Sequence, residues 1–201
     1  SFDEYKKLFD RAKEYVRAGD TYQVKISIRH ELDLKEYPWQ VYQRLRRANP
    51  SPYAAFLDLE DIVLVSCSPE ELMRLESRMV ETRPIGGTYH RGKTEREDEE
   101  IAKSFFEDEK EVAEHVMLID LERNDLGRVS KIGSVKVAEQ MAIEKYSNLM
   151  HIVTTIHGEL DSKKDSFDLV RIIFPVWTVS GCPKIRAMEI IDELEPVARS
   201  V

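Results

Sequence analysis

The stretch TVSGCPKIRAME at residues 178–189 passes from a polar loop, turned by glycine and proline, into a helix expected to run to about Leu194. Before this stretch, the sequence predicts strands over 134–139 and 149–158 and a helix near 166–173. Strands and helices therefore follow one another without regular alternation. This order predicts an α+β fold, with antiparallel sheets and packed helices, and argues against a doubly wound parallel sheet.

The N-terminal half continues this mixed pattern. Apolar residues recur at helical spacing over 2–18 and stop at Gly19, and polar and apolar side chains alternate over 22–28, as in a half-buried strand. A second helix is expected over about 38–48, before Asn49-Pro50-Ser51-Pro52 breaks it. Short strands are then expected to form an antiparallel meander, near 53–59, 61–66, 72–76 and 79–83.

Residues 94–126 contain no glycine or proline and many charges, which predicts one long helix or two abutting helices. Gly127 is expected to end this segment in the left-handed conformation. Glu111 and Glu114 share a face of the predicted helix, and Asp125 returns to nearly the same angle. Such carboxylates either surround a hard cation such as Mg²⁺ or form a solvated acidic face, and spacing alone favours the solvated face.

Composition excludes several classes of function. The 201-residue chain has a net charge of −8, whereas a general nucleic-acid binder needs a basic surface that displaces counterions from phosphates. No run of about 18 apolar residues predicts a membrane span, and the charged start is unlike a secretory signal, so we expect a cytoplasmic protein. Cys67 and Cys182 are expected to be reduced thiols.

Four motifs occur in one order: TRPIGGT at 82–88, EVAEHVMLIDLERND at 111–125, YSNLMH at 146–151, and the stretch at 178–189. Together they resemble the chorismate-utilising enzymes, and within that family most closely the large subunit of anthranilate synthase. The resemblance implies that residues 1–201 form a chorismate-binding catalytic domain. It also implies a fragment that lacks the family's N-terminal part and is truncated at its C-terminal end, without the family's binding arginine and second metal-ligating glutamate.

The resemblance implies a metal and several substrate contacts. The family's Glu-x-x-Glu-His segment carries magnesium ligands, which assigns Mg²⁺ to Glu114 directly and to Glu111 directly or through water. Gly87 and Thr88 match backbone and hydroxyl contacts to chorismate, and glycine suits a place where backbone approaches a ligand closely. From the residues alone, this segment would equally suit a tight turn after a strand.

Further site residues follow from the same resemblance. Thr178 matches a substrate contact, and Lys184 stands where a cation could face the anionic site, although the first turn of a helix could also direct it to solvent. His151 matches a histidine near the reacting ring, where loss of pyruvate requires removal of a ring proton. Glu70 matches the residue that protonates the leaving hydroxyl. On the residues alone, His151 could be structural and Glu70 a capping residue in a turn.

Two positions favour ammonia as the nucleophile. Relatives that add water carry a general-base lysine at the position of Gln23, itself an expected substrate contact, and many aminodeoxychorismate synthases carry a nucleophilic lysine at the position of Gly86. The resemblance therefore implies anthranilate synthase component I, in which ammonia from a glutamine amidotransferase subunit adds to chorismate and pyruvate leaves. Aminodeoxychorismate synthase component I is the alternative, because some members lack that lysine. An inactive fragment or structural domain is a third possibility.

The sequence departs from the family pattern at three places. Trp177 stands where the family commonly has glycine before the threonine, and Tyr89-His90 replace the usual Arg-Pro. Ala54 follows Asn-Pro-Ser-Pro-Tyr, where tryptophan-producing members usually have methionine in a segment of the feedback site. Inhibition by tryptophan is therefore not assigned.

Overall fold

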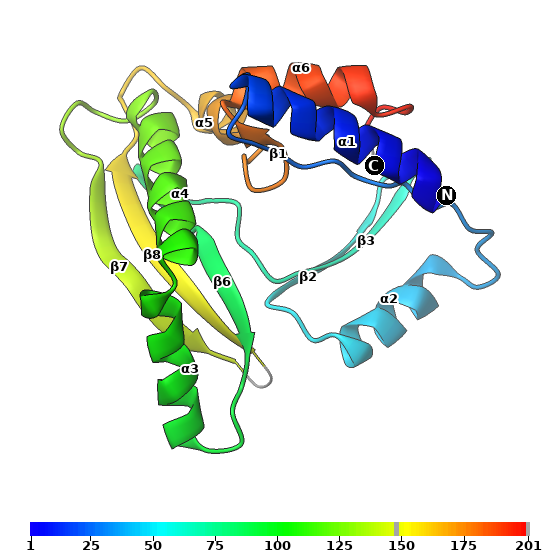
Figure 1. Ribbon diagram of the computed structural model, residues 1–201, viewed down its shortest axis with the longest axis horizontal. Helices are drawn as coiled ribbons and strands as arrows, with labels where there is room; N and C mark the ends of the chain where they lie inside the picture. The colour runs from blue at the N-terminus through cyan, green and yellow to red at the C-terminus, as the bar shows by residue number, and fades with distance from the viewer. Residues whose placement is uncertain (147–148, 200–201) are drawn as a thin grey trace. The chain divides into compact units, whose positions relative to one another are not determined.

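Figure 1 shows the computed structural model, which describes residues 1–146 and 149–199. The chain divides into two compact units. The central unit is continuous, Glu70–Phe174, and the split unit consists of Ser1–Pro69 and Pro175–Val201. The chain therefore passes from one unit to the other twice.

In the split unit, two helices from distant parts of the sequence lie side by side, α1 (Phe2–Ala18) and α6 (Lys184–Leu194) (Figure 1). Gly19 ends α1 with a φ angle of 82°, a conformation that glycine adopts without strain. The hydroxyl of Tyr15 on α1 donates to the Glu193 carboxylate on α6 at 2.6 Å. This contact helps to hold the two helices together.

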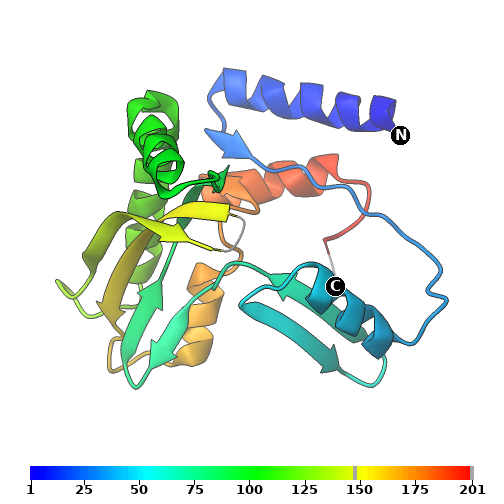
Figure 2. The same ribbon diagram turned by 90° about the horizontal axis from the view of Figure 1, so that it is seen from below.

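Two small sheets complete the split unit. β1 (Gln23–Val24) pairs antiparallel with β9 (Gly181–Cys182). A hairpin of β2 (Tyr53–Asp58) and β3 (Val63–Ser68) packs against α2 (Pro38–Ala48), as Figure 2 shows. An aromatic cluster joins the helix to the hairpin, with ring centroids 5.1–5.7 Å apart, and consists of Trp39, Tyr42 and Phe56.

The central unit is built around β8 (Leu149–Glu159), which pairs with antiparallel neighbours along both edges. β7 (Lys136–Lys145) lines one edge. β5 (Met79–Thr82) and β6 (Ile85–His90) follow each other along the other edge, and β4 (Arg74–Glu76) pairs with β5. Every strand pair in this sheet is antiparallel, so short connections suffice.

Two helices, α3 (Glu95–Glu107) and α4 (Glu109–Gly127), cover one face of this sheet (Figure 1). Asp108 ends α3 and accepts hydrogen bonds from the first turn of α4, so one residue separates two helices. A shorter helix, α5 (Ser166–Ile173), packs against α4. Side chains from these elements form the core of the central unit: Val80, Phe105, Leu126, Met150, Ile152, Ile156, Leu169 and Ile173.

The predicted α+β class is confirmed, and so are the helices over 2–18, 38–48 and 166–173 and the helix that begins at Lys184. The segment over 94–126, expected to be one long helix or two abutting ones, forms two abutting helices. None of the described helices is both long enough and apolar enough to span a bilayer.

The structure differs from the expected elements at several places. The strand over 22–28 shrinks to β1, because backbone pairing ends with the bond from the Lys25 amide to Ser180, and the Ser27 amide donates to the Glu195 side chain. The meander is divided, since β2 and β3 form their own sheet and β4 and β5 join β8. The glycine-containing segment 85–90 is a strand, and β7 extends to Lys145. Gly127 is the last residue of α4 and is not left-handed.

Candidate functional site

A bulge in β6 exposes backbone at the centre of the TRPIGGT motif. Ile85 pairs with Val153 and Thr88 with His151, so Gly86 and Gly87 together lie opposite a single residue of β8. A Cβ atom on Gly87 would lie 2.7 Å from the Tyr89 ring and 3.2 Å from the Phe105 ring. Only glycine fits such a close approach, which leaves main-chain groups, rather than side chains, at this point.

Next to the bulge, Thr88 and His151 form a hydrogen-bonded pair. The Thr88 hydroxyl lies 3.0 Å from His151 Nδ1, with Thr88 exposed and the His151 residue only 8% exposed. Burial lowers the pKa of His151, and the nearby charge of Glu144 partly opposes that shift. The imidazole is therefore neutral near pH 7 and can accept a proton.

Three further side chains surround His151. Glu144 is its register partner on β7, and Glu144 forms an ion pair with Arg83. The Tyr146 hydroxyl donates to Glu144 at 2.8 Å, and the Tyr146 ring meets the His151 ring edge-on at 5.5 Å between centroids. The Glu144 carboxylate is thus held by two donors beside the histidine.

Glu70 lies near the start of the same bulged strand. Burial raises the pKa of its carboxyl group, and a hydrogen bond with the backbone of Ile85, the residue before Gly86, partly opposes that shift. A carboxyl group with a raised pKa keeps its proton to higher pH than an exposed glutamate does. Such a group suits the role of a general acid.

Glu111 and Glu114 are half-buried on α4. Glu111 lies near Tyr89, whose pKa is raised by burial and by the negative charges of Glu111 and Asp108. Within residues 1–146 and 149–199, no group of three or more His, Cys, Asp or Glu side chains is arranged to hold a metal ion. Two carboxylates still fit Mg²⁺, which often binds through one or two of them together with waters and substrate oxygens.

The two faces of the central sheet carry different parts of the predicted site. Side chains alternate along β8, so His151 and Val153 face away from Thr154, which contacts α4 through His115. Thr88 and Glu144 are register partners of His151 and share its face. The structure therefore brings together Thr88 and His151, whereas Glu111 and Glu114 belong to the helix that covers the opposite face.

The remaining predicted residues belong to the split unit. Gln23 lies on β1 opposite Cys182, and Gly181, the neighbour of Cys182 on β9, has a φ angle of 141°. Thr178 is half-buried, and its hydroxyl has no hydrogen-bond partner among the described residues. Trp177 is 1% exposed and is thus a core residue. Lys184 is half-buried in the first turn of α6.

Comparison with known proteins identifies the family. The sequence profile of the chorismate binding enzymes matches residues 1–201. The chain belongs to this family. It is 52% identical to anthranilate synthase component 1 of Thermus thermophilus over 199 residues, which cover 99% of the chain and 43% of that protein. It is 50% identical to aminodeoxychorismate synthase component 1 of Bacillus subtilis, over 99% of the chain and 42% of that protein.

Solved structures of chorismate binding enzymes share the fold. Anthranilate synthase component I from Streptococcus pneumoniae superposes with a TM-score of 0.87 at 36% identity, over 97% of this chain and 43% of that one. An isochorismate synthase from Bacillus anthracis gives 0.71 at 21% identity, over 98% of this chain and 54% of that one, which shows likeness of fold alone. The chain spans less than half the length of the anthranilate synthase and aminodeoxychorismate synthase components named here.

Motif matching in this chorismate binding enzyme missed three residues beside His151, namely Arg83, Glu144 and Tyr146. Arg83 and Tyr146 lie inside quoted motifs but had no assigned role. Glu144 lies two residues before Tyr146, and the two-residue period of a strand would have placed both on one face. The missing information was the register between β7 and β8, which sets Glu144 opposite His151.

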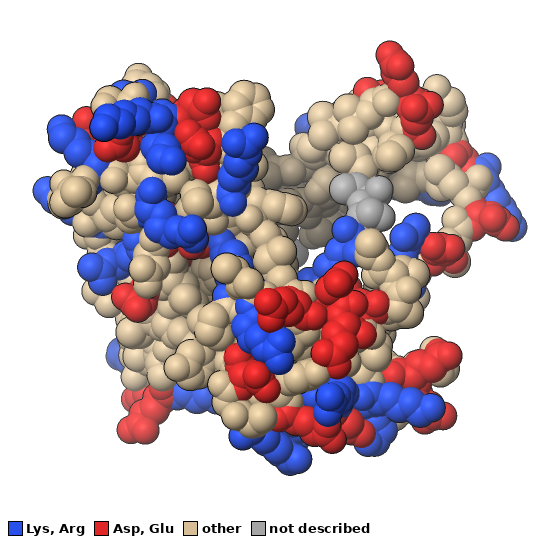
Figure 3. Space-filling model, turned by 90° about the horizontal axis from the view of Figure 1, so that it is seen from above, with Lys and Arg blue, Asp and Glu red and all other residues tan. Residues whose placement is uncertain are grey.

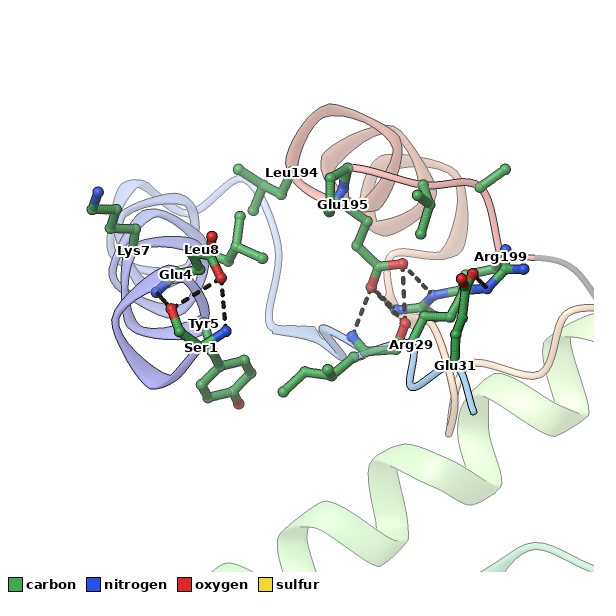
Figure 4. A pocket seen from close by; sticks show the side chains of 15 residues that line it. Ser1, Glu4, Tyr5, Lys7, Leu8, Arg29, Glu31, Leu194, Glu195 and Arg199 are labelled. Atoms are coloured by element: carbon green, nitrogen blue, oxygen red, sulfur yellow. Dashed lines mark hydrogen bonds and ion pairs between the residues drawn. The ribbon is translucent and has the colours of Figure 1, made fainter. Parts of the chain in front are cut away.

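Two cavities lie away from the predicted residues. One, of 940 Å³, lies in the split unit between the start of α1, residues 27–31 and residues 194–199. Figure 4 shows Glu195 at its wall, where the carboxylate accepts the Ser27 amide proton at 2.7 Å and pairs with Arg199. The other, of 530 Å³, lies beside the turn at Gly133 in the central unit. Neither is lined by a predicted site residue.

Proposed function

We propose that this chain carries the catalytic residues of anthranilate synthase component I. In this reaction ammonia adds to a ring carbon of chorismate, the ring hydroxyl leaves as water, and loss of pyruvate then gives anthranilate. The single observation that carries the proposal is the neutral His151, hydrogen-bonded to exposed Thr88 beside the Gly86–Gly87 bulge. This arrangement offers a base, a hydroxyl donor and the main chain of two glycines at one place.

The residues of the central unit can be assigned to the steps. The bulge backbone at Gly87 and the Thr88 hydroxyl would bind and orient the substrate. Protonated Glu70 would give its proton to the departing hydroxyl, and the attacking ammonia would lose a proton as the C–N bond forms. His151 would then remove the proton from the aminated ring carbon while the bond between the ring and the ether oxygen breaks. The enolpyruvate released takes up a proton at its methylene carbon and becomes pyruvate. Glu144, held by Arg83 and Tyr146, would stabilise the resulting imidazolium.

We propose Glu114 as a direct Mg²⁺ ligand and Glu111 as a direct or water-mediated one. Glu111 lies near Tyr89, the residue after Thr88, so an ion held there would supply positive charge for a substrate carboxylate at that part of β6. Gln23, Thr178 and Lys184 stay proposed substrate contacts.

We further propose a glutamine amidotransferase subunit as the source of ammonia and the cytoplasm as the location of the protein. The face drawn in Figure 3 intersperses acidic and basic side chains, and the net charge is −8, so nucleic acid is not a proposed partner.

The alternative function is aminodeoxychorismate synthesis, which the identity to the Bacillus subtilis enzyme favours. Product analysis separates the two. The full-length gene product would be mixed with chorismate, Mg²⁺ and excess ammonium at mildly alkaline pH, and the products identified by mass spectrometry. Anthranilate with pyruvate supports the main proposal, and aminodeoxychorismate supports the alternative. Unreacted chorismate would instead favour a domain without this activity.

Ligand binding tests that third possibility. Calorimetry would measure chorismate binding to the protein with and without Mg²⁺. Binding that depends on Mg²⁺ would argue against a purely structural domain. Absence of binding in both conditions would contradict the proposed function.

A further inference from the structure

His115 is the most confined titratable side chain beside the bulge. It is 0% exposed, and its Nε2 atom lies 2.8 Å from the hydroxyl of Thr154 on β8. The same hydroxyl accepts the backbone N–H of Met141 at 2.9 Å, at a point where β7 is irregular and Met141 has a φ angle of 55°. The backbone N–H of Thr154 donates to Pro84, just before β6, at 3.2 Å. The His115 ring is therefore fixed by a residue that joins three strands.

The other side of the ring is pressed against Gly86. A Cβ atom added there would overlap His115 Nδ1 and would lie 2.9 Å from Cγ and 3.1 Å from Cε1. All three atoms belong to one rigid ring, so a small rotation cannot remove the overlap. The Phe105 ring packs edge-on against His115, with centroids 6.5 Å apart. Nδ1 has no hydrogen-bond partner among the described residues, because the glycine backbone occupies its place.

We propose that His115 is the positioning and specificity-determining residue that keeps position 86 free of a side chain and holds the Gly86–Gly87 bulge in its substrate-contacting shape. The ring links α4, which carries Glu111 and Glu114, to the bulge in β6 and to Thr154 in β8. Any side chain at position 86 requires the ring to leave its place. The identity of residue 115 therefore determines which residues position 86 accepts.

A consequence for chemistry follows, and it rests on the proposed function. Many aminodeoxychorismate synthases carry a nucleophilic lysine at the position of Gly86, and here the His115 ring fills the space that such a side chain would need. With histidine at position 115 the lysine amine is excluded, so the nucleophile has to arrive as a free molecule such as ammonia. The steric relation between the two positions does not depend on the reaction.

The test is a double-mutant cycle in the full-length gene product, with Gly86→Lys, His115→Ala and the double variant. Thermal unfolding is measured first, because it requires no activity. Gly86→Lys should lower the unfolding midpoint by roughly 2–10 °C, as expected for overpacking. His115→Ala leaves a cavity and also lowers it. In the double variant the lysine should lower the unfolding midpoint little or not at all below that of His115→Ala, since the space beside position 86 is free.

Thr154→Val is the matched control, because it removes the hydrogen bond to His115 but leaves the ring in place. Combined with Gly86→Lys, Thr154→Val should leave the loss in unfolding midpoint caused by the lysine unchanged. Recovery only with His115→Ala supports the proposal. The proposal would be overturned if Gly86→Lys lowered the unfolding midpoint equally with histidine or alanine at position 115. It would also be overturned if Thr154→Val reduced the loss caused by the lysine as much as His115→Ala does.

Kinetics provide the readout that a purely structural role would not change. His115→Ala should raise the KM for chorismate by about tenfold, with a smaller change in kcat, because the bulge loses its support. An unchanged KM in a folded, less stable variant would contradict the positioning role. If the parent protein does not convert chorismate but the stability cycle shows recovery, the proposed function fails and the steric relation stands.

Discussion

Strand register places His151 between a hydroxyl group and a carboxylate. The residue pairs across β6 with Thr88 and across β7 with Glu144, so a hydroxyl and a carboxylate flank one imidazole. The motif identified His151 and Thr88 by resemblance, and the structure shows that they form a hydrogen bond. Glu144 could not be found in this way, because no sequence pattern states which residue of β7 lies opposite His151.

Removal of the proposed base should mainly lower the rate. We expect His151→Asn to reduce kcat by about 10²–10⁴-fold with a smaller change in KM, since a general base acts in the transition state. Steady-state kinetics with chorismate and ammonium provide the measurement. Thr88→Val should affect KM as well, because Thr88 is also a proposed substrate contact. Equal kcat in His151→Asn and the parent protein would exclude His151 as the base.

The pH dependence of kcat/KM should report the lowered pKa of His151. Because burial lowers the pKa of His151, kcat/KM should fall only as pH decreases below about 6.5, the ordinary value of histidine. Glu144→Gln removes the charge that opposes the shift, so the acid limb of the profile should move to still lower pH. A limb above pH 6.5, or a shift to higher pH in Glu144→Gln, would contradict this assignment.

The same pKa shift has a consequence for stability. Folded His151 binds a proton less readily than an unfolded histidine, so unfolding takes up a proton as pH decreases through about 6.5. The contribution of His151 to stability is therefore present above that pH and is lost below it. Urea unfolding of the parent protein and His151→Asn at several pH values would measure the difference, and parallel curves would argue against a lowered pKa.

Between elements, the short pair of β1 and β9 depends on one glycine. Gly181 has a φ angle of 141°, and a Cβ atom there would overlap the carbonyl oxygen of Gln23 and lie 2.9 Å from Ala187 Cβ. The sequence suggested a turn at Gly181 but could not show that the residue pairs with Val24, which is far away in the chain.

Gly181→Ala should therefore destabilise the protein by about 1–3 kcal/mol through overlap and backbone strain. Gly127→Ala is the control, because a Cβ atom at Gly127 meets no other atom within 4 Å and the residue ends a helix. This change should be neutral or slightly stabilising. Chemical unfolding of both variants provides the measurement, and similar losses in the two would contradict the predicted close approach.

The carboxylates of α4 lead to a prediction about the metal. If Glu114 is a ligand, Glu114→Gln should weaken Mg²⁺-dependent chorismate binding by about 10–100-fold while the helix stays folded. Calorimetry at several Mg²⁺ concentrations would detect the change, and circular dichroism would check the helix. Asp120→Asn on an exposed part of α4 is a matched control that should leave binding unchanged. Equal loss in both variants would contradict a specific role for Glu114.

At the scale of the whole molecule, the sequence predicted the fold class and most helices but not the division of the chain. The helices carry strong periodic patterns, which local sequence is enough to reveal. The division depends on which strands pair, and β3 and β4 were expected in one meander although they belong to different units. No composition change marks Pro69–Glu70 as the boundary.

The continuous central unit should fold without the rest of the chain. Residues 70–174 contain a complete antiparallel sheet, the covering helices and their own buried core. We expect this fragment to unfold cooperatively in urea and to keep its helical circular dichroism signal. The split unit needs two distant segments, so residues 1–69 alone should not unfold cooperatively. A central fragment without a cooperative transition would contradict the division.

β8 has partners along both edges and a helix on one face, so its amide protons can meet solvent only when neighbouring strands separate. Hydrogen exchange along β8 should therefore be the slowest in the central unit and should report its global opening. His151 thus stands on the most persistent strand, while Thr88 stands on β6, which pairs with β8 alone among the described strands. Local opening of β6 would move the Thr88 hydroxyl away and leave the His151 imidazole in place. Solvent would therefore enter the site first beside Thr88.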